Sequence, residues 1–191
     1  MPGRQAGLIV PAVLRQMLAY AHHSSFPARD RVIILLSVRA GMRAAEIAQL
    51  DWSMVLDARG QISDTITIRD AIAKKGSGRR VPMHQDLRWA LKTLKSRSEP
   101  SGPVIRSARG GEMRPNSIVN WFVQLFAELG IAGCSSHSGR RTFITAAARN
   151  AHRAGCSLRD VQLLAGHRSI ETTQRYIDGD TDSQRKLVSL L

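Results

Sequence analysis

Four groups of side chains have the residue types and spacing to act on a phosphate ester. In the first, His137 and Arg140 lie three residues apart at the expected start of a helix, so they share one face. A helix N-terminus attracts anions, and an arginine there can grip two phosphate oxygens while a histidine moves a proton. The pair is a weak signal alone, because a surface histidine beside an unrelated arginine has the same spacing.

The second group is a histidine followed by a tyrosine. We expect Gly166 to end one helix and His167 to occupy the turn. Tyr176, nine residues after His167, should then lie about two turns into a helix that begins at Ser169. A phenolate flanked by cations can attack phosphorus and hold a DNA end covalently. The alternative is that the tyrosine serves only in packing or at the surface.

The remaining two groups are an arginine with a glutamate and a pair of lysines. Arg43 follows a glycine break, and Glu46 comes three residues later on the same helical face, where a local surface ion pair is the alternative interpretation. Lys74 and Lys75 stand together at the start of an expected β-hairpin, although the chain has only five lysines. An ammonium group there could protonate a leaving hydroxyl or contact the DNA backbone.

The pattern of apolar residues predicts a mainly α-helical domain with one small antiparallel β-sheet. Helical spacing recurs over 9–18, 32–36, 87–94 and 118–129, after Gly139, and from Ser157, where a capping box is expected. Between 54 and 83 the pattern alternates, which predicts two strands joined by a glycine-containing hairpin. With 43% hydrophobic residues, residues 1–191 are expected to form a single domain.

The charge balance points to a polyanionic partner. Twenty-eight Lys and Arg against 15 Asp and Glu give a net charge of +13. The arginines are spread from Arg4 to Arg185, whereas a membrane-binding helix would concentrate its charge, so nucleic acid is the favoured partner and a generally basic surface the alternative. No run approaches the roughly 20 apolar residues that span a bilayer, and we expect a cytoplasmic protein.

Taken together, the order Gly-x-Arg-x-x-Glu, hairpin lysine, His-x-x-Arg, Gly-His, Tyr closely resembles tyrosine recombinases and phage integrases over nearly the whole chain. The resemblance implies the fold of their catalytic domain. It implies that Arg43 and Arg140 clamp the phosphate, that His137 transfers a proton and that His167 hydrogen-bonds the phosphate. It also implies that Tyr176 is the nucleophile and that Glu46 is a supporting acidic residue.

The resemblance also bears on the lysine and on one departure. Family hairpins commonly place the lysine eight residues before the proline of the following strand, here Pro82, which favours Lys74 and leaves Lys75 open. Gly139 stands where the family often has a large apolar residue just before the second arginine, so the packing of that helix start is expected to differ.

The activity implied by the resemblance is cleavage and rejoining of double-stranded DNA through a 3′-phosphotyrosine. It implies no metal and no cofactor, and the sequence has neither a Gly-rich phosphate loop nor a cluster with metal-ligand spacing. A homo-oligomer on DNA, as a tetramer or with a partner recombinase, is also implied. The alternatives are a type IB topoisomerase, which acts on one duplex, and a DNA-binding protein without turnover.

Two expectations concern the ends of the chain. Family members usually carry an N-terminal helical domain that closes a clamp around DNA, and we expect 1–191 to contain only the catalytic domain, either as a fragment or as a naturally short protein. The tail, 177–191, ends in the apolar residues Leu187, Val188, Leu190 and Leu191. It could pack on its own core, or it could be exchanged with a neighbouring protomer, as the resemblance favours.

Overall fold

The computed structural model describes residues 6–74, 76–97, 99–176 and 188–189. Helices dominate this part of the chain, and two short strands form an antiparallel sheet, which confirms the predicted fold class. In chain order the elements are α1 (Pro11–His23), α2 (Pro27–Ala40), α3 (Ala44–Ala48), η1 (Trp52–Met54), β1 (Thr65–Ile68), β2 (Arg79–Pro82), α4 (Gln85–Lys95), α5 (Pro115–Glu128), α6 (Ser138–Asn150), η2 (His152–Ala154), α7 (Leu158–Ala165) and α8 (Ile170–Gln174).

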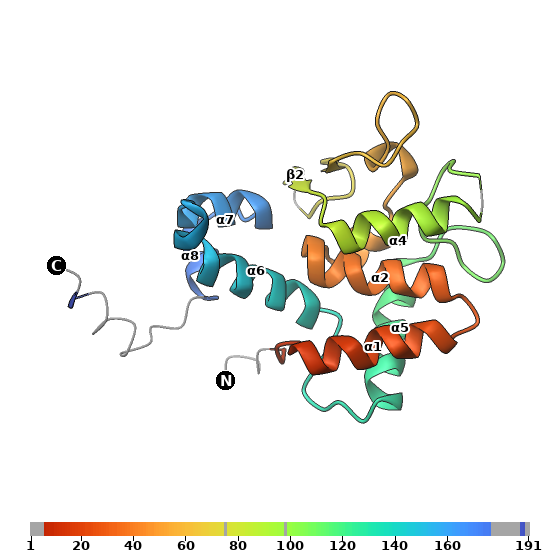
Figure 1. Cartoon of the computed structure of the whole chain (residues 1–191), viewed down its shortest axis with the longest axis horizontal. Coiled ribbons are helices and arrows are strands. Elements are labelled where there is room, and N and C mark those ends of the chain that lie inside the picture. Colours follow the sequence, from red (N-terminus) through yellow and green to blue (C-terminus); the bar gives the residue numbers. More distant parts are fainter. Residues whose placement is uncertain (1–5, 75, 98, 177–187, 190–191) are drawn as a thin grey trace.

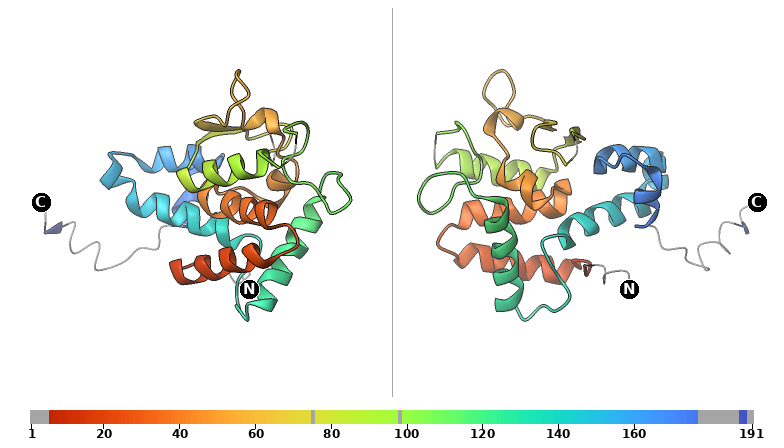
Figure 2. Two further views of the ribbon diagram at one scale, coloured as in Figure 1. Left: turned by 45° about the vertical axis from the view of Figure 1, so that its right-hand side comes forward. Right: turned by 180° about the vertical axis from the view of Figure 1, so that it is seen from behind.

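The main core forms around α2, whose residues from Val32 to Leu36 are all buried. A helix that is apolar on every side needs neighbours on every side, and α1, α4 and α6 all pack against it. In Figure 1, α1, α2 and α4 lie one above another and α5 crosses behind them, as the rear view in Figure 2 also shows. One large hydrophobic cluster joins these helices to the sheet.

The sheet pairs Ile66 with Val81 and Ile68 with Arg79. Burial alternates along both strands, as the sequence pattern predicted, with Ile66, Ile68 and Val81 facing the core. The fourth inward position of these two pairs is a charged residue, Arg79, and it too is buried. The sheet therefore directs one guanidinium group into the interior.

The last described elements form a smaller unit around a second core. Helix α6 leads from the main core to α7 and α8, which lie apart from the other helices on the left of Figure 1. Ile144, Val161 and Ala165 are buried here, and Tyr176 packs against them. The Ser157–Asp160 capping box at the start of α7 is present, as predicted.

One sequence expectation about this unit is wrong. Tyr176 does not lie within a helix, because α8 ends at Gln174 and Tyr176 follows in a turn. Its backbone N–H donates to the carbonyl of Thr173, which closes that turn at 3.0 Å. The expectations for the tail fall mostly on residues outside the described part. Val188 is one of the two tail residues that are described, and it is exposed. No described helix is long and apolar enough to cross a membrane.

Candidate active site

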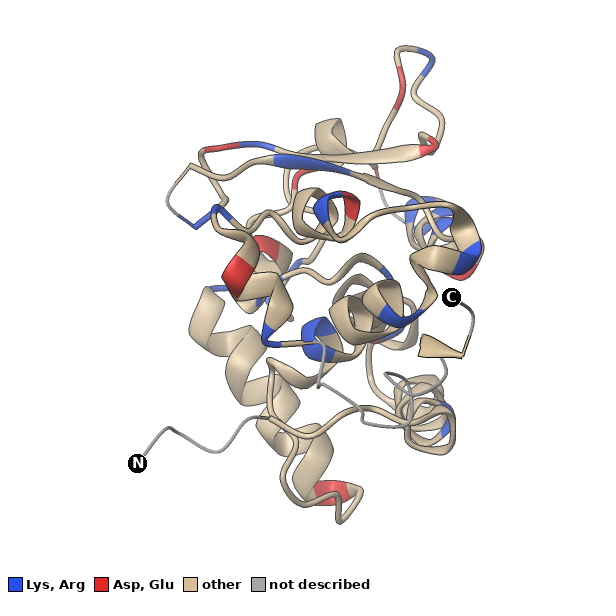
Figure 3. Cartoon of the chain, turned by 90° about the vertical axis from the view of Figure 1, so that its left-hand side faces the viewer, with Lys and Arg blue, Asp and Glu red and all other residues tan. Residues whose placement is uncertain are grey.

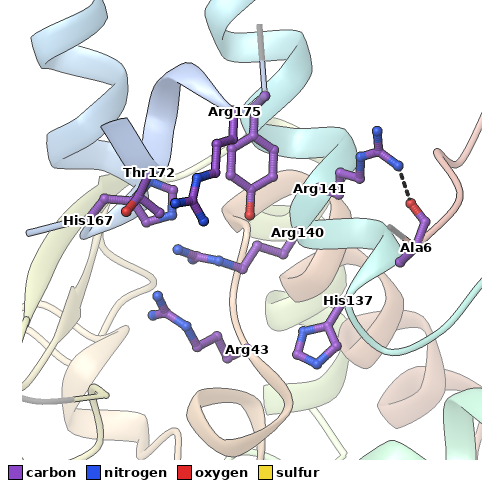
Figure 4. Close-up of a pocket in the computed structure, with 9 residues that line it drawn as sticks. Ala6, Arg43, His137, Arg140, Arg141, His167, Thr172 and Arg175 are labelled. Carbon is purple, nitrogen blue, oxygen red and sulfur yellow. Dashed lines mark hydrogen bonds between the residues drawn. The ribbon is translucent and has the colours of Figure 1, made fainter. Parts of the chain in front are cut away.

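A cavity of about 330 Å³ lies where the smaller unit meets the main core. Five of the residues singled out from the sequence line it, although they come from four separate segments of the chain. Figure 4 shows Arg43, Arg140 and Arg175 directed towards His167, with His137 to one side. The full lining is Ala6, Arg43, His137, Arg140, Arg141, His167, Thr172, Arg175 and Tyr176.

A second, smaller cavity of about 240 Å³ adjoins the first and is lined by Lys74. Arg43, His167 and Thr172 line both cavities, whereas Tyr176 lines only the first. Arg43 and His167 therefore lie between the tyrosine and the lysine. Lys75, the alternative hairpin lysine, lies outside the described residues.

Arg43 is held by a buried carboxylate. Its backbone N–H and its Nη1 each donate to Glu46 at 2.9 Å. Arg79 adds two further hydrogen bonds, from Nη1 to Oε1 at 2.8 Å and from Nη2 to Oε2 at 2.9 Å. The side chain of Glu46 is 0% exposed and that of Arg79 3%, while Arg43 keeps 22% exposed. The interpretation of Arg43 and Glu46 as a surface ion pair is therefore wrong.

The carboxylate of Glu46 is ionised despite its burial. Burial alone would raise its pKa, but the hydrogen bonds and charge of Arg79, together with Arg43, lower the pKa to about 2. Each oxygen of Glu46 accepts from both arginines. Glu46 thus orients Arg43 while leaving part of its guanidinium group open to the cavities.

Arg140 connects three segments of the site. Its Nη1 donates to the carbonyl of Gly41 and its Nη2 to the carbonyl of Ala165, both at 2.6 Å. These carbonyls come shortly before Arg43 and His167, so one guanidinium group fixes the backbone that carries both. Burial and the charges of Arg43 and Arg79 lower the pKa of Arg140 to about 9, which leaves it protonated at neutral pH.

Two glycines allow these segments to approach closely. Gly41 ends α2 with a φ of 60°, and a Cβ there would overlap the ring of Phe143 on α6. Gly166 ends α7 with a φ of 63°, and a Cβ there would lie 2.9 Å from Cδ of Arg79. The hairpin therefore packs directly on the turn that presents His167.

His167 is held in its turn by both its backbone and its ring. The carbonyl of His167 accepts from Gln162 Nε2 at 2.9 Å, and Nδ1 lies 2.9 Å from Thr173 Oγ1. The ring stacks on that of Tyr176, with centroids 5.7 Å apart. Burial and the charges of Arg140, Arg43 and Arg79 lower the pKa of His167 to about 4, so the imidazole is neutral at pH 7.

His137 is exposed at the N-cap of α6, and Arg140 is buried in the first turn. Gly139 lies between them, and a Cβ at this position would overlap the side chain of Ser37 on α2. The glycine thus lets the start of α6 press against α2, where a large apolar side chain would not fit. This is the expected difference in packing at the start of the helix.

Several lining residues were not identified from the sequence. Arg175 precedes Tyr176, and Arg141 follows Arg140 and donates to the carbonyl of Ala6 at 2.5 Å. Arg79 lines neither of these two cavities but binds Glu46, and its inward position in an alternating strand was the signal that could have revealed it. Figure 3 shows basic residues on the strands, helices and loops of the side that carries α6, α7 and α8.

Comparisons with known proteins identify the family. Residues 9–182 match the model of the phage integrase family. The tyrosine recombinase XerC of Rhizobium meliloti strain 1021 is 30% identical over 159 residues, which cover 81% of this chain and 46% of XerC. The chain spans about half the length of the curated relatives it matches.

Solved structures share the fold. The Tn1549 transposon integrase, in complex with a circular intermediate DNA, superimposes with a TM-score of 0.77 at 17% identity, over 100% of this chain and 67% of that one. The XerH site-specific recombinase bound to its difH substrate gives a TM-score of 0.72 at 20% identity, over 97% and 54% of the two chains. The chain belongs to the phage integrase family, and its fold is that of the catalytic domain of tyrosine recombinases.

Proposed function

We propose that this chain is the catalytic domain of a site-specific DNA recombinase that cleaves and rejoins strands through a 3′-phosphotyrosine at Tyr176. One observation supports this best. The guanidinium groups of Arg43 and Arg140, the imidazoles of His137 and His167 and the phenol of Tyr176 line one cavity, and a lysine lines the cavity beside it. A phosphodiester placed between Tyr176 and Lys74 would have a nucleophile on one side and a proton donor on the other.

The reaction then proceeds by in-line displacement. The phenolic oxygen of Tyr176 attacks phosphorus, the bond to the 5′ oxygen breaks, and Lys74 gives that oxygen its proton. His137 takes up the proton of the tyrosine. A 5′-hydroxyl from another strand reverses the step, so the bond energy is conserved and no nucleotide cofactor is consumed.

Charge that develops on the phosphoryl oxygens is neutralised by the arginines. Arg43 and Arg140 lie at the cavity with their positions fixed by Glu46 and by two carbonyls, so little reorganisation is needed in the transition state. The neutral imidazole of His167 donates a further hydrogen bond to a phosphoryl oxygen. These cations supply the electrostatic stabilisation that a metal ion gives in other phosphoryl-transfer sites, so the proposed reaction requires no metal ion.

The proposed partner is double-stranded DNA. The net charge of +13 favours it, and the transposon integrase and XerH were both solved with DNA. We further propose a cytoplasmic protein that assembles on DNA as a homotetramer or with a partner recombinase, and that this chain supplies the catalytic half of a clamp around the duplex.

The tail is proposed to link protomers in that assembly. Leu187, Leu190 and Leu191 crowd the end of the chain beside the exposed Val188. Deleting Ser183 to Leu191 should leave single-turnover cleavage measurable and weaken assembly on paired sites. Equal loss of thermal stability and cleavage in the dilute monomer would instead show that the tail packs on its own core.

A nicked suicide substrate drawn from the DNA around its own gene tests the proposal. Loss of the short fragment beyond the nick traps the covalent complex, which is then resolved on a denaturing gel, and a labelled second duplex reports strand transfer. An adduct with strand transfer supports a recombinase. Relaxation of supercoiled DNA without strand exchange would favour a topoisomerase, and binding without any adduct would favour a DNA-binding protein.

A further inference from the structure

The hydroxyl group of Thr173 contacts the imidazole of His167 from inside the protein. Thr173 lies on α8 and is 0% exposed, and its Oγ1 is 2.9 Å from Nδ1 of His167. Within the described part of the chain, this ring nitrogen is the only hydrogen-bond partner of that hydroxyl. The contact therefore determines which proton can lie between the two atoms.

Only one arrangement satisfies both groups. If Nδ1 carried the proton, the hydroxyl oxygen would accept it and the buried hydroxyl proton would have no acceptor. A buried donor without a partner is costly, so the hydroxyl donates and Nδ1 accepts. A neutral imidazole carries one proton, which must then be on Nε2.

The charges around the ring favour the opposite arrangement. Arg140, Arg43 and Arg79 all lie close enough to disfavour added positive charge on His167. Before a phosphate binds, these cations would favour the tautomer that has its proton on Nδ1, because the lone pair of Nε2 would then face them. Thr173 opposes this preference from the far side of the ring.

We propose that Thr173 is a positioning residue that fixes the Nε2–H tautomer of His167, so that His167 presents a ready donor to a phosphate oxygen. The value of that donor rests on the proposed function, whereas the tautomer itself does not. With Nδ1 bound to Thr173, Nε2 is the nitrogen left to face the cavities that His167 lines. The Nε2–H donor of His167 is thus in place before DNA binds.

The tautomer can be measured directly. Long-range proton–nitrogen NMR on the uniformly ¹⁵N-labelled chain without DNA, at pH 7, separates protonated from unprotonated ring nitrogens, and His167→Gln assigns the signal. Thr173→Val keeps the shape and removes the hydroxyl, Thr173→Ser keeps the hydroxyl, and Thr172→Val makes the same change one residue earlier, where no bond to His167 exists. Thermal unfolding of each variant reports folding.

We expect the Nε2–H tautomer in the wild type, in Thr173→Ser and in Thr172→Val. Loss of one ordinary hydrogen bond in Thr173→Val should move the tautomer ratio towards Nδ1–H by about fivefold. Single-turnover cleavage should slow in Thr173→Val and recover in Thr173→Ser.

An Nδ1–H tautomer in the wild type or in Thr173→Ser would overturn the proposal even if Thr173→Val failed to fold. An unchanged tautomer ratio in folded Thr173→Val would also overturn it. The expected tautomers without any covalent adduct in the wild type would refute the proposed function and leave the Thr173 assignment intact.

Discussion

Replacing Arg79 by methionine should destabilise the fold severely, although Arg79 touches neither cavity. Methionine fills a similar volume on β2 but removes both hydrogen bonds to Glu46. Glu46, at 0% exposed, would keep only Arg43 as a cationic partner. A buried carboxylate that loses its main partner keeps less compensating charge and gains no hydration in return.

Two lines of reasoning give similar magnitudes for this loss. Removing one partner of a buried ion pair generally costs about 3–5 kcal/mol. Arg79 and Arg43 together, against the effect of burial, lower the pKa of Glu46 from 4.5 to about 2, which corresponds to about 3 kcal/mol in favour of the ionised form, and Arg79 is the larger contributor. The expected loss is therefore about 3 kcal/mol, a large share of the roughly 5–15 kcal/mol that stabilises a domain.

Urea unfolding followed by circular dichroism measures this loss. Arg80→Met is the matched control, because Arg80 is the next residue on β2 and its side chain is exposed, so its effect should stay within about 0.5 kcal/mol. Adding Glu46→Gln to Arg79→Met should recover about 2 kcal/mol relative to the sum of the single changes. A cost below about 1 kcal/mol for Arg79→Met, or strict additivity of the two changes, would refute the reasoning.

Two further predictions concern Lys74 and His167. Lys74→Ala should slow cleavage strongly. A substrate with sulfur as the bridging 5′ atom should restore cleavage, because a thiolate leaves without a proton. A defect that this substrate rescues in Lys75→Ala but not in Lys74→Ala would assign the role to Lys75. His167 has its folded pKa lowered from 6.5 to about 4, so between these values the unfolded chain binds the additional proton and stability should fall as the pH falls. Urea midpoints of the wild type and His167→Gln at pH 7 and pH 4.5 test this, and an equal drop in both proteins would contradict it.

Local signals in the sequence predicted the elements well. The apolar runs predicted helices α1 and α2, Gly41 predicted the end of α2, and the Ser157–Asp160 box predicted the start of α7, because these features depend on residues within one or two turns. The alternation around Ile66 and Val81 predicted the sheet for the same reason. The site residues followed from motif order, and the structure brings five of them into one cavity.

Features that depend on distant segments could not be predicted in this way. Arg140 binds carbonyls that are 99 and 25 residues away in the sequence, and Arg79 binds Glu46 across 33 residues. The position of Tyr176 was predicted wrongly because helical spacing was extended past the end of α8, where tertiary packing against Ile144 and Val161 places the tyrosine in a turn. Burial of Glu46 likewise reflects the approach of β2.

Identification of the residue joined to DNA tests the central claim most directly. Tyr176→Phe removes only the phenolic oxygen, so folding and DNA binding should stay near those of the wild type. Wild-type protein trapped on a nicked substrate should yield, after digestion, a peptide that carries a 3′-linked nucleotide on Tyr176, and Tyr176→Phe should yield no adduct. An adduct that survives in Tyr176→Phe, or one that maps to another residue, would contradict the account.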